Sequence, residues 1–169
     1  MDADPFDAFG IDPTFDIDED ALRRAWLARS LAAHPDRAAG DDAHADTARL
    51  NDARRVLQNP ELRADALLRR LGGPAKDQEK GLPDGFLMNV MLWREELDAA
   101  RSGGNAEEVE ACRARAVADR AACIERVRSA FASLADPPEP SALAALRVEL
   151  NAWRYLERLM DELDRPEVA

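Results

Sequence analysis

The chain has 169 residues, enough for one or two small domains that each bury a modest core. Its formal net charge is −11, and both halves are acidic: residues 1–73 hold 15 acidic and 10 basic side chains, and residues 74–169 hold 19 and 13. This balance argues against nucleic acid or an anionic membrane as the main partner. Abundant Ala, Leu, Arg and Glu, with 5% aromatic residues, predict an all-α protein.

The sequence also indicates a reducing compartment. Cys112 and Cys123 fall in one helical pattern without a CxxC pair, and they are most simply read as small buried side chains. The apolar runs are too short for a membrane span, and the acidic N-terminus lacks the basic flank of a signal peptide. We therefore expect a cytoplasmic protein.

Three helical segments are predicted in the first 58 residues. The segment 2–10 reads as a short helix that Gly10 ends, with Phe6 and Phe9 facing a core. A second helix is expected from Asp18, a good N-cap, to Ala33, and a third from about residue 43 to Gln58. Together the longer two predict a helical hairpin.

The motif His34-Pro35-Asp36-Arg37 lies between the two long helices. Pro35 ends the first of them, because proline lacks a backbone N–H and disfavours helical backbone in the residue before it. The simplest interpretation of the motif is a solvated turn. A metal site that joins His34 to His44 is disfavoured, since no further ligands occur at helical spacing.

In this position, at the tip of an N-terminal hairpin, the motif resembles that of the J domain, a module that engages DnaK-class chaperone ATPases. The resemblance implies that the chaperone contacts fall on the tip and on a basic face of the helix before it. The residues concerned are His34, Pro35, Asp36, Arg37, Arg23, Arg24 and Arg29.

A fourth helix should begin at Pro60 after an Asn59 cap and end at Gly72-Gly73-Pro74. The run from Asn59 to Gly72 is similar to the segment that distinguishes the HscB type of J protein, the co-chaperone of iron–sulfur cluster assembly. The Gly- and Pro-containing stretch that follows predicts a linker. We therefore expect a J domain at 1–73, a linker at 74–85 and a second domain at 86–169, which the HscB resemblance implies is a three-helix scaffold-binding domain.

The helix that begins at Phe86 has more apolar residues than one core-facing stripe requires. Phe86, Val90, Trp93 and Leu97 supply that stripe, and Leu87, Met88 and Met91 are surplus. The surplus side chains are either buried on a second side or exposed to a partner, and the small size of a three-helix bundle favours exposure. Two more helices are predicted, Glu107 to Leu134 and Ser141 onward.

Phe86-Leu87-Met88 followed by Arg94-Glu95-Glu96-Leu97 is similar to the HscB motif that contacts IscU, the scaffold on which clusters are built. The resemblance places scaffold contacts at Leu87, Met88, Met91, Glu95 and, on the last helix, Tyr155. Two further positions that are acidic in the family are Leu92 and Ala99 here. The resemblance therefore implies a surface that depends more on apolar contact.

No Ser/His/Asp or Cys/His set occurs, so we expect no enzyme and no cofactor. The resemblance implies a co-chaperone of iron–sulfur cluster biogenesis that delivers an IscU-type scaffold to an HscA/DnaK-class chaperone and stimulates its ATPase. Two alternatives stay open: a J protein with a different client, and a structural helical interaction protein. A metal-dependent enzyme is a more distant third.

Overall fold

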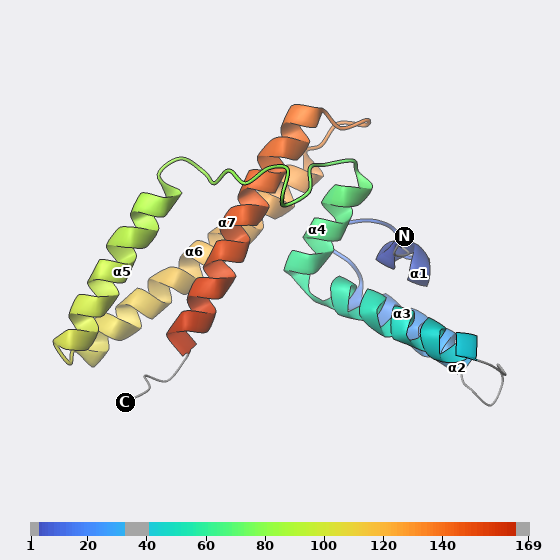
Figure 1. Ribbon diagram of the computed structural model, residues 1–169, viewed down its shortest axis with the longest axis horizontal. Coiled ribbons are helices and arrows are strands. Elements are labelled where there is room, and N and C mark those ends of the chain that lie inside the picture. Colours follow the sequence, from blue (N-terminus) through green and yellow to red (C-terminus); the bar gives the residue numbers. More distant parts are fainter. Residues whose placement is uncertain (1–3, 33–40, 165–169) are drawn as a thin grey trace. The chain divides into compact units, whose positions relative to one another are not determined.

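The computed structural model describes residues 4–32 and 41–164, and within these ranges all regular structure is helical (Figure 1). The chain divides into two compact units, with the boundary between Gly72 and Gly73. The prediction of an all-α fold is confirmed. Within the described ranges, no helix combines the length and the apolarity that a membrane span requires.

The first unit holds α1 (Pro5–Phe9), α2 (Glu19–Ala32), α3 (Asp41–Gln58) and α4 (Pro60–Arg70), and α2 and α3 pack side by side as the predicted hairpin (Figure 1). The predicted caps are confirmed. The Asn59 side chain accepts from the Leu62 N–H at 3.0 Å, and the Asp18 carboxylate accepts from the Ala21 N–H at 3.0 Å. Gly10 ends α1 in the left-handed conformation, with a φ of 64°.

The short helix α1 is anchored by its two aromatic side chains, as predicted, since Phe6 and Phe9 are buried. A pair of carboxylates then ties it to α4. The Arg70 guanidinium lies 2.7 Å from an Asp4 carboxylate oxygen and 2.9 Å from one of Asp7. These hydrogen bonds raise the pKa of Arg70 above its ordinary value.

A buried arginine at the base of the hairpin was not predicted. Arg63 of α4 is only 7% exposed, and its guanidinium donates to the backbone carbonyls of Phe15 at 2.8 Å and Leu57 at 2.5 Å. It also lies 5.6 Å from the centre of the Phe15 ring. Arg63 thus joins the loop before α2 to the end of α3 by hydrogen bonds that satisfy otherwise buried carbonyls.

The second unit is a three-helix bundle of α5 (Phe86–Ser102), α6 (Ala106–Ala132) and α7 (Pro140–Asp164), in which each helix runs antiparallel to the one before it (Figure 1). Helix α6 packs against both of its neighbours. The sides of α6 and α7 that face into the bundle are apolar, and their buried residues include Cys112, Ala116, Cys123, Val127, Leu143, Leu146, Leu150, Trp153, Leu156 and Leu163.

One detail of this bundle differs from the sequence interpretation: Phe86, assigned to the core, is only half-buried. Helix α7 also buries Ala152 and Leu159, which are 0% and 3% exposed. The reason is that α7 contacts three neighbours: α6, the start of α5 and the segment that precedes α5. It therefore buries a wider face than a single stripe.

The segment 74–85, predicted as a linker, is hydrogen-bonded along α7. The Arg147 Nε donates to the Pro74 carbonyl at 2.9 Å, and the Asn151 amide donates to the carbonyls of Glu79 and Gly81, both at 3.0 Å. A Cβ on Gly81 would lie 3.3 Å from the Val148 side chain, so glycine permits this close approach. We call residues 74–81 the strap.

Candidate functional site

The outer face of α5 carries a cluster of large exposed apolar side chains. Leu87, Met88, Met91 and Leu92 are 52%, 61%, 59% and 47% exposed. They lie at helical spacing on the side of α5 opposite its buried residues, so they form one continuous surface. The prediction that the surplus apolar residues are exposed rather than buried is confirmed. We call these four residues the α5 patch.

The rotation of α5 about its axis is fixed by its buried face. Val90, Trp93 and Leu97 are each no more than 6% exposed. The Trp93 indole N–H donates to the Cys112 carbonyl of α6 at 3.0 Å. Because this bond and the packing hold one side of α5 inward, the opposite side must face solvent. The bundle therefore presents the α5 patch on a rigid element.

Of the remaining predicted scaffold contacts, Glu95 lies on the same side of α5 as the patch, exposed and about one turn beyond Met91. Tyr155 lies instead against the first residue of α5: its half-buried ring meets the Phe86 ring edge-to-face, with centroids 5.6 Å apart. Glu96, the residue that follows Glu95, is occupied by an ion pair with Arg115 at 2.6 Å. Glu95 thus places an exposed carboxylate beside the apolar surface.

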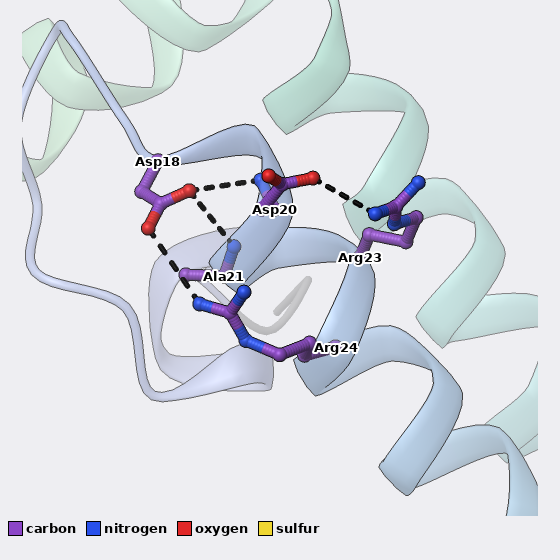
Figure 2. Close-up of polar contacts among 5 residues, drawn as sticks. All are labelled: Asp18, Asp20, Ala21, Arg23 and Arg24. Carbon is purple, nitrogen blue, oxygen red and sulfur yellow. Dashed lines mark hydrogen bonds and ion pairs between the residues drawn. The ribbon is translucent and has the colours of Figure 1, made fainter.

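Two basic residues of α2, Arg23 and Arg24, are exposed but engage acidic neighbours (Figure 2). Arg23 lies 2.9 Å from Asp20, and Arg24 lies 3.6 Å from the second oxygen of Asp18. The backbone N–H of Ala21, which the same carboxylate accepts, lowers the pKa of Asp18. Arg29, the third predicted contact, is exposed. Exposed pairs of this kind contribute at most about 1 kcal/mol each, so a more acidic partner can displace them.

The predicted chaperone-binding tip, His34, Pro35, Asp36 and Arg37, lies outside the described residues. The structure describes α2 and α3, the two helices that flank these residues in sequence. The Arg54 guanidinium of α3 lies 4.0 Å from the centre of the Trp26 ring of α2. This cation–π contact joins the two helices of the hairpin.

Among the described residues, no three His, Cys, Asp or Glu side chains gather in a way that could hold a metal ion. The two cysteines are free thiols buried in the bundle. Burial raises the pKa of the Cys123 thiol to about 11. Its Sγ lies 3.7 Å from the Glu149 carbonyl of α7.

Because of Cys123, we expect the bundle to lose stability at alkaline pH. The folded state favours the protonated thiol, so this contribution is complete below the ordinary pKa of 9.0 and is lost as the pH rises toward about 11. We expect the free energy of unfolding to fall by on the order of 2 kcal/mol across that window. Urea denaturation at pH 8 and pH 11 measures the change. The Cys123→Ala variant is the control, and an equal fall in the variant would contradict this assignment.

Taken together, the described residues form an all-helical chain of two compact units, with an exposed apolar patch on α5 and exposed arginines on α2. The family model for the HSCB C-terminal oligomerisation domain matches residues 82–164. The co-chaperone protein HscB homolog of Bordetella petrii is 35% identical over 167 residues, which cover 95% of this chain and 94% of that one. The homolog of Azoarcus sp. is 32% identical over 169 residues, covering 95% and 92%.

Solved structures of the same kind share the fold. Chaperone HscB from Vibrio cholerae matches with a TM-score of 0.75 and 23% identity, over 96% of each chain. Human co-chaperone protein HscB matches with a TM-score of 0.77 and 20% identity, over 95% of this chain and 80% of that one. The protein thus has the architecture of a J-type domain followed by a helical bundle. The chain belongs to the HscB co-chaperone family.

Proposed function

We propose that this co-chaperone serves iron–sulfur cluster biogenesis: it binds an IscU-type scaffold protein and delivers it to an HscA/DnaK-class chaperone, whose ATPase it stimulates. The scaffold contacts are Leu87, Met88, Met91, Glu95 and Tyr155. The chaperone contacts are His34, Pro35, Asp36, Arg37, Arg23, Arg24 and Arg29.

The observation that carries the proposal is the α5 patch. Four large apolar side chains, each 47–61% exposed, follow one another along a single helix face. Apolar clusters of this kind on an otherwise charged surface mark sites for other proteins. Two of the four are methionines, whose flexible side chains adapt to a partner's relief. Glu95 and the Tyr155 ring supply polar and aromatic contacts at the edges, as interfaces commonly have.

On the chaperone side, the support comes from charge. The chain is strongly acidic overall, yet α2 carries three arginines, and its only acidic residues, Glu19 and Asp20, lie in its first turn. An acidic surface on the chaperone complements these arginines and can replace their exposed pairs with Asp18 and Asp20. One chain that holds both sites raises the effective concentration of the scaffold at the chaperone.

A J protein with a different apolar client remains the second candidate. The α5 patch indicates that the partner has an apolar surface, but it does not identify which protein the partner is. Reconstitution from purified components distinguishes the two. We expect the chain to stimulate ATP hydrolysis by a DnaK-class chaperone, and we expect an IscU-type scaffold to increase the stimulation further. Stimulation without any effect of the scaffold would favour a different client. No stimulation at all would contradict the co-chaperone assignment of the tip.

A further inference from the structure

The face of α2 that points away from the hairpin core holds two exposed leucines. Leu27 is 48% exposed and Leu31 is 65% exposed. They are four residues apart, so their side chains are neighbours on the helix surface. The core side of α2 is occupied instead by Leu22, which is 1% exposed, and by the partly buried Trp26. The two leucines are therefore not part of the buried core of the hairpin.

The same face continues toward the start of α2 with Arg23 and Arg24. Leu27 lies four residues after Arg23 and three after Arg24, the spacings at which helical side chains are adjacent. Both arginines are exposed, with 66% and 69% of their side-chain surface accessible. The outer face of α2 is thus a surface with two cations at one end and two leucines at the other, which leads toward residues 33–40.

We infer that Leu27 and Leu31 are contact residues for the chaperone, and that its docking surface pairs an acidic rim with an apolar depression. This inference rests on the proposed function. The charge of α2 indicates what kind of surface binds it, because the arginines favour an acidic partner. If that partner surface had no apolar part, the two large leucines would stay exposed beside it. A partner that covers both kinds of side chain gains apolar burial that salt does not screen.

The two parts of the surface should respond differently to ionic strength. Contacts of Arg23 and Arg24 weaken as salt rises, because the Debye length falls from about 10 Å at 0.1 M to about 3 Å at 1 M. Contacts of the leucines persist. We therefore expect chaperone affinity to fall with salt toward a plateau instead of vanishing, and we expect the leucines to set the level of that plateau.

The test is a titration of the full chain against the ATP-bound DnaK-class chaperone at several salt concentrations. Leu27→Ala/Leu31→Ala should weaken binding by on the order of tenfold or more at every salt concentration and should keep the wild-type salt slope. Arg23→Gln/Arg24→Gln should instead reduce the slope. Val117→Ala is the matched control, since it removes an aliphatic side chain of α6 that is 49% exposed. Alanine is chosen because it favours the helix.

The outcomes separate cleanly. A leucine variant that binds as tightly as wild type throughout overturns the inference. Failure of the wild-type chain to bind the chaperone at all overturns the proposed function, and this inference with it. Sedimentation equilibrium tests whether a second copy of the chain, and not the chaperone, binds this face. If the wild type self-associates and the leucine variant does not, the face is a contact between copies and the inference fails.

Discussion

Simultaneous replacement of Leu87, Met88 and Met91 with alanine should weaken binding of an IscU-type scaffold by at least roughly 100-fold, because a few central apolar anchors usually dominate such an interface. The melting temperature should hardly change. The three side chains are 52–61% exposed, and alanine keeps the helix, so little burial and no helix propensity is lost. A thermal melt and a scaffold titration on the same preparation measure both effects.

Two controls sharpen this experiment. Trp93→Ala removes a residue that is 4% exposed and donates a buried hydrogen bond, so it should cost on the order of 3–5 kcal/mol of stability. Val117→Ala removes an exposed aliphatic side chain outside the patch and should leave scaffold binding unchanged. Normal melting together with full-strength scaffold binding in the triple variant would refute the proposed scaffold site.

The second large effect concerns the tip. His34→Gln or Asp36→Asn should reduce stimulation of the chaperone ATPase to background, because the proposed contact depends on these two side chains. The free energy of unfolding should change by no more than about 0.5 kcal/mol, since a residue between two helices at a hairpin tip contributes little burial. Steady-state ATP hydrolysis with and without the variant chain gives the readout.

Asp52→Asn provides the matched control for the tip variants. It makes the same carboxylate-to-amide change on α3, where Asp52 is 76% exposed and forms only a surface pair with Arg55 at 3.7 Å. We expect this variant to stimulate the ATPase as wild type does. Retained stimulation in His34→Gln and Asp36→Asn would remove the J-type function from the tip. Scaffold binding should survive in all three variants, because the α5 patch lies on the other unit.

The helices could be predicted from the sequence because their signals are local. Asp18, Asn59 and Gly10 act through hydrogen bonds or backbone conformation within a few residues, and each cap occurs where the pattern indicated. The two faces of α5 were likewise predictable. A single helix cannot bury both sides against one small bundle, so the spacing of Trp93 and Met91 already separates core from surface.

What sequence reasoning missed depends on long-range contacts. Arg63 and Arg147 read as ordinary charged helix residues, yet each is buried and donates to a carbonyl of a distant segment. The exposed Leu27 and Leu31 were missed for a related reason. A helix with several leucines and alanines offers more than one possible core face, and the choice depends on how it packs against α3. The one sequence feature that could have predicted their exposure is that α2 has more apolar residues than a single core-facing stripe requires.

The strap has a consequence for the order in which the bundle assembles. Asn151 and Arg147 lie 70 to 73 residues after the carbonyls that they hold. Closing a loop of that length costs about 4 kcal/mol of chain entropy, whereas three hydrogen bonds return only about 3 kcal/mol net. The hydrogen bonds of the strap thus do little more than balance the cost of closing the loop. We therefore expect the strap to close once the apolar faces of α6 and α7 have met, and a nascent chain that has not yet produced α7 cannot form it.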